Sequence, residues 1–366
     1  MKNWFQSNFK LLLTCITIFA LSLLIISYRR SAPKKIEKTR LLSPSPSLPP
    51  RNLLKDKDLS ELFTYYPDPQ KATSHNPDEV TIIATGDIIP ARSVNSIMVN
   101  KNDFTYPYHH IAPLLSAGDI TLINLEAPLL QDCIPTIEGM VFCGSSRSIA
   151  GLRYAGVDIA NLANNHAGNY GISGIESTKK ILTDAHIQVT GSESPVVTQV
   201  KGITFGFLGY NSIGAPEQGL SWADAQAITK QIAQLKQNGA QFVVVSFHWG
   251  TEYTHDPDPS QIALAHLAVD AGADLIIGNH PHWVQGVEWY KNGFVTYAHG
   301  NTVFDQMWSQ ETREGVIAQY TFKKTGLIDI KYFPTIIEDY SQPRFATETE
   351  AKKILKDMRD HSLKND

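Results

Sequence analysis

The chain has 366 residues, of which 42% are hydrophobic and 19% are charged, and its formal net charge is −4. This composition supplies enough apolar side chains for a sizeable core, and it excludes a mainly disordered protein, a collagen and a coiled coil. Because 32 basic residues stand against 36 acidic ones, no strong positive field attracts nucleic acid, and we expect no nucleic acid partner.

An uncharged apolar run covers residues 11–28, close to the N-terminus. About 20 apolar residues, each rising about 1.5 Å, cross the hydrocarbon core of a bilayer. A secretory signal peptide is the alternative, but its apolar region is shorter, about 7–15 residues, and a small-x-small cleavage site follows it. Since Tyr28 is followed by Arg29 and Arg30 instead, we predict an uncleaved transmembrane anchor over residues 1–30.

The orientation of this anchor rests on two opposing arguments. More basic residues follow the apolar run than precede it, and the positive-inside rule therefore favours a cytoplasmic C-terminal part. The rule weakens for long domains, and an N-terminal hydrophobic segment before a globular domain is the usual arrangement of an exported protein. We expect a single-pass protein of the cell membrane whose C-terminal domain lies outside the cytoplasm.

A linker separates the anchor from the globular part. Residues 41–50 read LLSPSPSLPP, and such prolines disfavour helices and sheet ladders. We assign residues 31–77 to a basic and Pro/Ser-rich linker and residues 78–345 to the globular domain. The charged residues 346–366 form a C-terminal tail in this scheme, in which a short helix precedes a frayed end.

Within the globular domain, continuous apolar runs alternate with amphipathic stretches. The expected strands are Val80–Thr85, Ile120–Asn124, Asp158–Ala163, Ile203–Tyr210, Phe242–Phe247 and Ala273–Gly278. The expected helices are Gly174–Ala185, Trp222–Gln237 and Ser260–Ala271. Later runs at Gly286–Tyr290, Phe294–Tyr297, Ile317–Phe322 and Leu327–Phe333 are broken by short turns and indicate hairpins. Together they predict an α/β sandwich with mixed sheets.

Polar side chains follow five of these strands, where each strand ends. Ligands of open α/β sheets bind beyond the carboxyl ends of the strands. We therefore expect convergence of Asp87, Glu126, Asn165, His166, His248, His280 and His282. Carboxylate and amide oxygens with imidazole nitrogens suit Mn²⁺, Fe or Zn²⁺, and they exceed what one ion needs. Two divalent ions bridged by a carboxylate, about 3.5–4 Å apart, are the predicted cofactors.

Each motif alone also has a purely structural explanation. Gly86-Asp87 after a strand is a common turn or helix cap, and Asn-Asn-His forms hydrogen-bonded turns. The pair His280 and His282, separated by a rigid proline, favours a metal most strongly. The joint pattern of several strand ends carries the prediction.

The ordered motifs resemble the bacterial poly-γ-glutamate capsule synthesis family (CapA-type proteins), which is related to calcineurin-like metallophosphoesterases. The resemblance covers about residues 80–306. The matching residues are Gly86-Asp87 with Arg92, Asn124-Leu125-Glu126, Asn164-Asn165-His166 with Gly171, His248-Trp249-Gly250 with Glu252-Tyr253, Gly278 with His280-Pro281-His282, Gln285, Glu288, Gly300-Asn301 and Phe304-Asp305. The fold that this resemblance implies is a metallophosphatase-like αββα sandwich.

The resemblance also implies roles for individual residues. The ligands of one metal ion would be Asp87, Glu126 and His282, with Glu126 bridging. The ligands of the second would be Asn165, His248 and His280. His166 is similar to the histidine that serves metallophosphoesterases as general acid or transition-state contact.

Two residues are assigned to the substrate side of the site. Arg92 is a candidate for binding an anion, and the alternative is an arginine that closes a salt bridge. Glu252 is expected close by, where it could orient a metal-bound histidine.

The sequence departs from the family patterns at three positions. Ile89 stands where phosphoesterases usually carry the histidine of Asp-x-His, so one metal site lacks a ligand. Asn169 stands where the capsule family often has an aspartate, which would orient His166 and raise its pKa more strongly than an amide does. His299 replaces a residue that is usually apolar, and the sequence alone gives no interpretation of it.

The chain has three cysteines, too few for a disulfide scaffold. Cys15 lies in the apolar run. If the geometry allows, Cys133 and Cys143 could close a disulfide that contributes up to about 3 kcal/mol in an oxidising compartment, or they could be two unrelated small residues.

Two functions of different classes fit these observations. The first is a membrane-tethered dimetal hydrolase or transferase that acts on an anionic polymer or a phosphorylated intermediate, with His166 protonating the leaving group. The second is a non-catalytic subunit of a capsule synthesis or export complex that binds polymer or partner proteins. Ile89 and Asn169 favour the second, whereas the gathered ligands favour the first.

Overall fold

The computed structural model describes residues 59–69 and 76–363. The predicted anchor over residues 1–30 and most of the predicted linker lie outside these residues. Within the described part of the chain, no helix combines the length and the apolar character needed to cross a bilayer.

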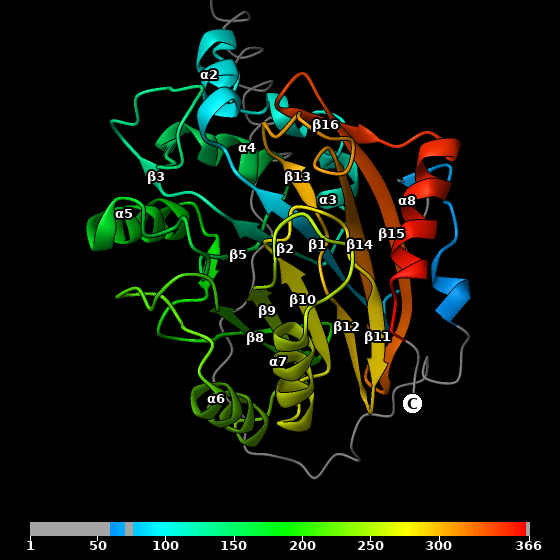
Figure 1. The fold of residues 1–366 in the computed structure, drawn as a ribbon. Coiled ribbons are helices and arrows are strands. Elements are labelled where there is room, and N and C mark those ends of the chain that lie inside the picture. Colours follow the sequence, from blue (N-terminus) through cyan, green and yellow to red (C-terminus); the bar gives the residue numbers. More distant parts are fainter. Residues whose placement is uncertain (1–58, 70–75, 364–366) are drawn as a thin grey trace, which may run out of the picture. The chain divides into compact units, whose positions relative to one another are not determined.

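Two mixed β-sheets form the centre of the structure (Figure 1). The first sheet has the order β16-β15-β14-β1-β2-β5-β6, and β13 pairs with β1. Its strands are β1 (Val80–Ile88), β2 (Ile120–Leu125), β5 (Ile159–Asn161), β6 (Gln188–Thr190), β13 (Asn301–Val303), β14 (Glu314–Lys323), β15 (Gly326–Glu338) and β16 (Gln342–Phe345). The strands β1, β2, β5 and β6 are parallel, whereas β14, β15 and β16 add as antiparallel neighbours.

The second sheet has the order β11-β12-β10-β9-β8-β7. Its strands are β7 (Val196–Val200), β8 (Ile203–Asn211), β9 (Phe242–His248), β10 (Leu275–Asn279), β11 (Val287–Tyr290) and β12 (Gly293–Thr296). The four central strands are parallel, and the two edge strands are antiparallel. A further short pair joins β3 (Leu129–Leu130) to β4 (Gly144–Ser145). The predicted hairpins are confirmed as β11–β12 and β14–β15.

The alternation of side chains along the strands creates the layers. Successive residues of a strand point to opposite faces of its sheet. In β1, Ile82 and Ala84 join the core between the two sheets, together with Phe205 and Val244 of the second sheet. Ile83, between them, joins the separate core beneath the helices on the other face. Both faces of β1 are therefore buried, which explains its continuous apolar sequence.

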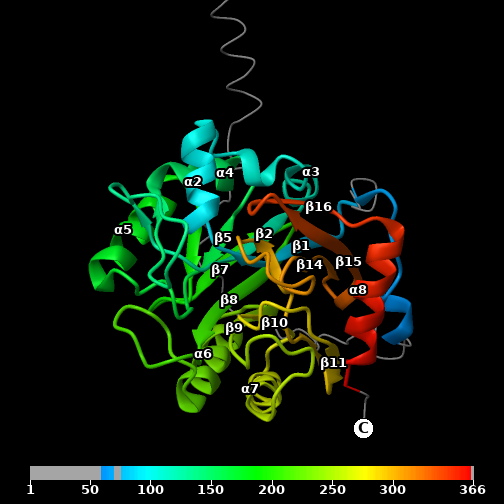
Figure 2. The ribbon, with the colours of Figure 1, turned by 45° about the horizontal axis from the view of Figure 1, so that its top comes forward.

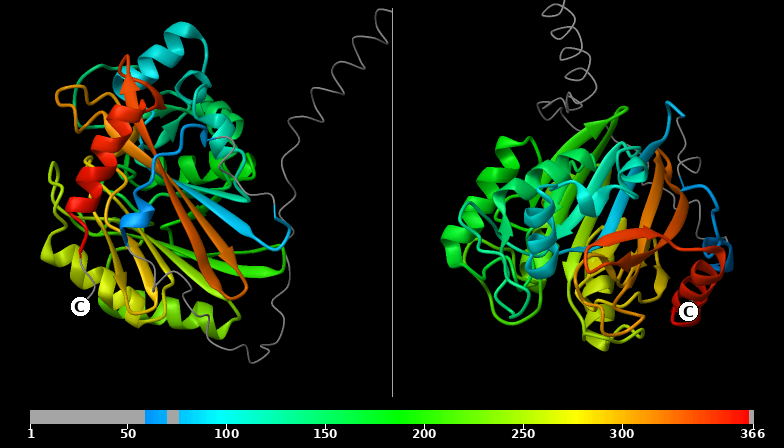
Figure 3. Two further views of the ribbon diagram at one scale, coloured as in Figure 1. Left: turned by 90° about the vertical axis from the view of Figure 1, so that its right-hand side faces the viewer. Right: turned by 90° about the horizontal axis from the view of Figure 1, so that it is seen from above.

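Helices cover the outer face of each sheet, as Figures 2 and 3 show. The first sheet is covered by α2 (Arg92–Lys101), α3 (Ala112–Leu115), α4 (Ile149–Tyr154) and α5 (Gly171–Asp184). The second sheet is covered by α6 (Ala225–Gln237) and α7 (Pro259–Asp270). Short 3-10 turns lie at Leu59–Leu62, Tyr106–Tyr108 and Ser146–Ser148. The described residues thus form the predicted α/β sandwich with mixed sheets, with α5, α6 and α7 at three positions where helices are expected.

The last helix belongs to the core, although the sequence places the domain end at residue 345. Helix α8 (Glu348–Asp360) runs beside β15 (Figure 1). Its buried residues join the core between the sheets, and they are Ala351, Ile354, Leu355 and Met358. Thr347 and Glu350 form a reciprocal capping box that fixes the start of the helix. The charged residues that suggested a tail lie on its exposed face.

Candidate metal centre

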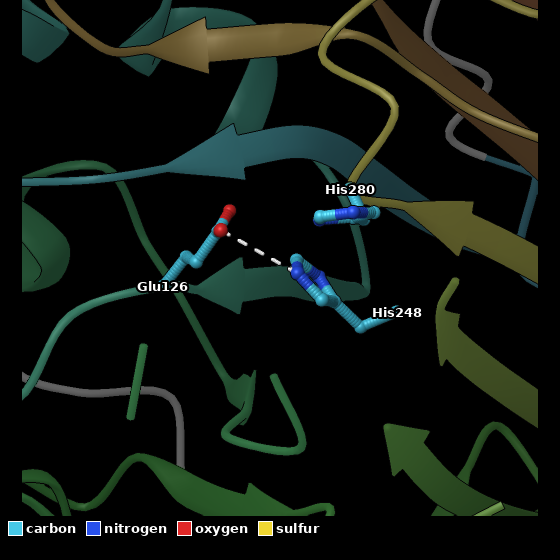
Figure 4. Close-up of side chains that lie close together, drawn as sticks. All are labelled: Glu126, His248 and His280. Carbon is cyan, nitrogen blue, oxygen red and sulfur yellow. Dashed lines mark ion pairs between the residues drawn. The ribbon is translucent and has the colours of Figure 1, made fainter. Parts of the chain in front are cut away.

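The carboxyl ends of strands from both sheets meet at one site. Strands β1, β2 and β5 of the first sheet lead into Asp87, Glu126 and Asn165. Strands β9 and β10 of the second sheet lead into His248 and into the segment that carries both His280 and His282. Figure 4 shows Glu126, His248 and His280 pointing toward one another, although they come from three different strand ends. The convergence predicted from the strand ends is present.

Three groups of side chains offer ligand atoms that lie within 4.8 Å of one another. These groups are Asp87/Glu126/His282, Glu126/His248/His280 and Glu252/His280/His282. The first two share Glu126, in the arrangement that the family resemblance implies for a bridging carboxylate. Asn165 lies beside them, because its Oδ1 is 2.8 Å from Nε2 of His248. All six residues predicted as ligands therefore lie in one cluster.

A close approach between two backbones places Asp87. A Cβ atom on Gly86 would lie 2.1 Å from the carbonyl oxygen of Gly300, so only glycine fits there. The backbone N–H of Asp87 donates to that same carbonyl oxygen at 2.9 Å. Its carboxylate accepts from Nδ2 of Asn124 at 2.8 Å and from the backbone N–H of His280 at 3.3 Å. Strand pairing and hydrogen bonding thus fix Asp87 from both sheets.

His280 and His282 take up unusual backbone conformations. Their φ angles are 98° and 59°, in the left-handed region that residues with a Cβ rarely adopt. Nδ1 of His282 lies 2.9 Å from Oδ1 of Asn301 and 3.2 Å from Oδ2 of Asp87. Backbone conformations of this kind persist where the surrounding contacts determine them, and they cluster at functional sites.

Glu126 is the least satisfied group of the site. Its side chain is fully buried, and neither carboxylate oxygen accepts a hydrogen bond from the described residues. Burial, together with the charge of Asp87, raises the pKa of Glu126 well above its ordinary value. A buried carboxylate of this kind is costly unless a cation or donors compensate it.

His280 shows the same deficit on the nitrogen side. Its ring is 4% exposed, and Nδ1 has no hydrogen-bond partner among the residues that the structure places. Burial lowers the pKa of His280 well below its ordinary value, and it lowers the pKa of His248 to about 3. Both rings are therefore neutral at pH 7, which is the form that binds metals. Unpaired buried oxygens beside neutral imidazoles fit a divalent cation.

His282 behaves differently because it lies against Asp87. Burial opposes the charge of this ring, but the hydrogen bond to Asp87 and the nearby charges of Glu126 and Asp87 together outweigh burial and raise the pKa of His282 to about 9. Burial would likewise raise the pKa of Asp87, yet His282, His248 and the hydrogen bond from Asn124 together lower it. His282 is therefore protonated and Asp87 is ionised at pH 7. Binding of a cation by both side chains would release the proton of His282.

His166, the predicted catalytic residue, lies at the edge of the cluster. Its Nδ1 is 3.0 Å from Oδ1 of Asn169, and its ring stacks on Phe142 with 4.0 Å between centroids. The same Asn169 oxygen accepts from the backbone N–H of Phe142 at 2.7 Å. Burial lowers the pKa of His166 to about 4. Asn169 thus orients the ring from the position where the family often has an aspartate.

Arg92 closes a salt bridge. Its Nε donates to Oδ1 of Asp305 at 3.1 Å, its Nη2 contacts the same oxygen, and its Nη1 donates to the carbonyl oxygen of Gly139 at 3.3 Å. The guanidinium carbon also lies 5.0 Å from the ring of Phe142 and 4.9 Å from that of Phe304. These contacts match the salt-bridge alternative for Arg92 rather than a free anion-binding arginine.

Ile89 and His299 are both part of the protein interior. Ile89 packs in a small apolar cluster with Ala127, Phe142 and Phe304, and its side chain offers no ligand atom. Nδ1 of His299 lies 3.2 Å from the carbonyl oxygen of Thr85, and its Nε2 lies 3.0 Å from the hydroxyl of Tyr320. His299 is therefore a hydrogen-bonded core histidine.

Several asparagines support the site, although none of them is predicted as a ligand or as a catalytic residue. Nδ2 of Asn161 donates to Oδ1 of Asn124 at 3.0 Å, and Asn124 in turn donates to Asp87. Oδ1 of Asn164 accepts from the backbone N–H of His166 at 3.2 Å, which forms the turn that carries this histidine. Asn124 and Asn164 stand in the matching motifs, whereas Asn161 has no local signal that could have identified it.

Cys133 and Cys143 form a disulfide with 5.8 Å between their Cα atoms, which confirms the first of the two alternatives. The bond closes a loop that contains Phe142, the residue directly before Cys143. Because Phe142 stacks on His166 and faces Arg92, the disulfide-closed loop forms one wall of the site.

The sequence matches one family model and several known proteins. The family model described as "Bacterial capsule synthesis protein PGA_cap" matches residues 81–306. The chain is 30% identical over 302 residues to the "Capsule biosynthesis protein CapA" of Bacillus anthracis, covering 77% of this chain and 73% of that protein. It is 29% identical to the "PGA biosynthesis protein CapA" of Bacillus subtilis, covering 70% and 71% respectively. A solved structure described as a novel phosphatase from Mycoplasma pneumoniae aligns with 12% identity and a TM-score of 0.46, over 72% of this chain and 95% of that one.

Proposed function

Because the chain belongs to the bacterial capsule synthesis protein family PGA_cap, we propose that it takes part in forming a capsule polymer of the poly-γ-glutamate type. Its role in that process is a metal-dependent hydrolysis or transfer on the anionic polymer or on a phosphorylated intermediate. The observation that carries this proposal is the fully buried carboxyl group of Glu126, which accepts no hydrogen bond from the described residues and belongs to two groups of potential ligands.

Two divalent ions, of Mn, Fe or Zn, are the cofactors of this proposal. One would be held by Asp87, Glu126 and His282, and the other by Glu126, His248 and His280 with Asn165 beside them. When bound, such ions polarise a phosphoryl or carbonyl oxygen and lower the pKa of water.

The protein itself contributes orientation and a proton carrier. A proton on Nδ1 of His166, donated to Asn169, leaves Nε2 free to take up a proton and deliver it to a leaving group. The stacking of Phe142 on the same ring restricts its rotation. His166 and most of the proposed ligands are buried, which strengthens the electrostatic contacts among them.

A second candidate function is a non-catalytic subunit of a capsule synthesis or export complex that binds the polymer or partner proteins. Ile89 favours this candidate, because an apolar side chain occupies a position where a ligand is expected. In that case the cations would serve to bind anionic groups rather than to activate water.

The membrane anchor and the extracytoplasmic placement of the domain are part of the same proposal. The disulfide between Cys133 and Cys143 supports the placement, since such bonds persist in oxidising compartments. Protease added to cells stripped of their wall should degrade the domain without lysis. Complete protection of the domain until lysis would reverse the proposed orientation.

Elemental analysis of the purified full-length protein tests the metal centre. We expect close to two equivalents of transition metal in the wild type and a loss of most of it in the double variant His280→Ala/His282→Ala. His110→Ala, an exposed histidine outside the three groups, serves as the matched control and should keep the wild-type content. A wild-type protein that holds no metal after reconstitution would reject the proposal.

The same preparations separate the two candidate functions. If the protein is catalytic, His166→Ala should keep its metal but lose about 10²–10⁴-fold in turnover and fail to support capsule formation in cells. If it is a binding subunit, His166→Ala should support normal amounts of capsule.

A further inference from the structure

The group that contains Asp87 has few donors. Asp87, Glu126 and His282 supply three side chains, whereas first-row divalent ions are bound by four to six ligands in proteins. Ile89, directly after β1, supplies no further donor, because its side chain is apolar and is buried with Phe142 and Phe304. A further ligand must come from another element or from solvent.

Glu252 is placed where it can fill this deficit. Its carboxylate and the rings of His280 and His282 offer ligand atoms that lie within 4.8 Å of one another. It differs from the other members of the three groups in being partly exposed, whereas they are buried. His280 and His282 each belong to one of the Glu126 groups as well, so Glu252 lies close to one member of each of these two groups.

The loop after β9 is built to hold Glu252 in this position. Gly250 has φ 85°, and a Cβ there would lie 2.4 Å from the side chain of Gln261, so glycine is required. Tyr253 adopts φ 62°, and its backbone N–H donates to the carbonyl oxygen of Pro281 at 2.9 Å. This bond joins the residue after Glu252 directly to the residue between the two histidines.

An independent observation points to a cation at this group. Nδ1 of His280 is buried and lacks a partner among the described residues. An acidic side chain close to two imidazoles could be a chance surface cluster. A buried ring nitrogen without a partner, however, costs free energy unless a ligand binds to it.

We propose that Glu252 is a direct metal ligand of this protein, which supplies the donor that Ile89 does not. This inference rests on the proposed function, since it assumes that the centre holds divalent ions. It differs from the expectation that Glu252 contacts substrate or only orients a histidine, because a ligand changes the number of donors around the ion.

The test compares Glu252→Gln with wild type after both are purified at full length and reconstituted with Co²⁺. Glutamine preserves the size of the side chain and removes its charge, and circular dichroism checks that the variant is folded. Competition with a chelator should show an affinity for one of the two ions that is at least tenfold weaker. The visible absorption of the bound Co²⁺, which reports its coordination, should change in position or intensity.

Glu311→Gln serves as the control, because Glu311 is also half-buried but belongs to none of the three donor groups. It should bind two ions with wild-type affinity and the wild-type spectrum. Wild-type affinity together with an unchanged Co²⁺ spectrum in Glu252→Gln would overturn the inference while leaving the proposed function intact. A wild-type protein that binds no Co²⁺, Mn²⁺ or Zn²⁺ would instead reject the proposed function itself.

Discussion

Asn169 holds His166 through an oxygen that serves two donors at once. This oxygen accepts from Nδ1 of His166 at 3.0 Å and from the backbone N–H of Phe142 at 2.7 Å. Because an amide oxygen carries only a partial charge, it orients the ring without stabilising its protonated form strongly. Burial therefore dominates and lowers the pKa of His166 to about 4.

The variant Asn169→Asp tests this balance. Aspartate keeps both acceptor contacts and places a full negative charge beside the ring, which should raise the pKa of His166 by about one to three pH units. An NMR titration of the imidazole protons gives the midpoint directly. Asn169→Ala removes the contact and is the control, whose midpoint should stay low; a midpoint in Asn169→Asp equal to that in wild type would contradict the argument.

The same change alters the dependence of stability on pH. The pKa of His166 in the folded state lies below its ordinary value of about 6.5. Its neutral ring therefore contributes to the free energy of unfolding above pH 6.5, and this contribution is lost as pH falls through about 4. A higher pKa of His166 in the folded state reduces the difference between its folded and unfolded pKa values. The free energy of unfolding of Asn169→Asp should consequently fall less than that of wild type between pH 6.5 and 4.

At the scale of elements, the regular repeats of apolar residues were sufficient to predict most of the fold. The buried strand β9 was expected at Phe242–Phe247 and spans Phe242–His248, and α6 was expected at Trp222–Gln237 and spans Ala225–Gln237. The start of α6 differs because Asp224 caps the helix through the backbone N–H of Ala227, whereas Trp222 precedes the cap. Periodicity identifies an element, and the capping contact then determines where it begins.

Elements whose burial depends on distant partners were harder to predict. Helix α8 carries many charges, and its four buried positions make sense only once β15 is known to lie beside it. A short helix is predicted after residue 345, but its packing in the core is not. The short strand β13 is not predicted at all, because its three residues, Asn301–Val303, are too few to show a periodic pattern. It pairs with β1 at Asp87, so its position is set by contacts across more than 200 residues of sequence.

The disulfide-closed loop shows the same limitation at the site. The sequence contains the two cysteines, but whether Cys133 meets Cys143 depends on the path of the chain between β3 and β4. That path also brings Phe142 onto the ring of His166 and the carbonyl oxygen of Gly139 to Arg92. The disulfide between Cys133 and Cys143 therefore helps to fix the orientation of His166, the proposed proton carrier, through the stacked ring of Phe142.

At the scale of the whole molecule, the site exists because two sheets present their strand ends to each other. The ligand types and their attachment to strand ends could be predicted, since buried parallel strands place such residues at one edge. The partition between two sheets could not, and neither could the network of Asn124 and Asn161 that supports Asp87. Glu252 was expected near the site, but its place beside His280 and His282 depends on the backbone bond between Tyr253 and Pro281.

This arrangement makes the stability of the domain depend on what the site binds. Glu126, from the first sheet, belongs to one donor group with Asp87 and to another with His248 and His280 of the second sheet. Without a cation, its buried carboxyl group accepts no hydrogen bond from the described residues, and its contact with His248 is 3.4 Å long, from Oε1 to Nε2. This group therefore destabilises the junction of the two sheets. When the free cation concentration is 100 times the dissociation constant, binding at each independent site adds about 2.7 kcal/mol to the free energy of unfolding.

The variant Glu126→Gln should therefore separate stability from binding. In metal-free protein the change removes the cost of burying a carboxyl group beside Asp87, the same cost that raises the pKa of Glu126 well above its ordinary value. The amide can also donate to Asp87, so the free energy of unfolding should rise by about 1–3 kcal/mol. Added Mn²⁺ or Zn²⁺ should stabilise the wild type strongly and the variant little. Urea denaturation of both proteins, with chelator and with metal, measures the four values; equal stabilisation of both by metal would show that Glu126 does not hold the cations.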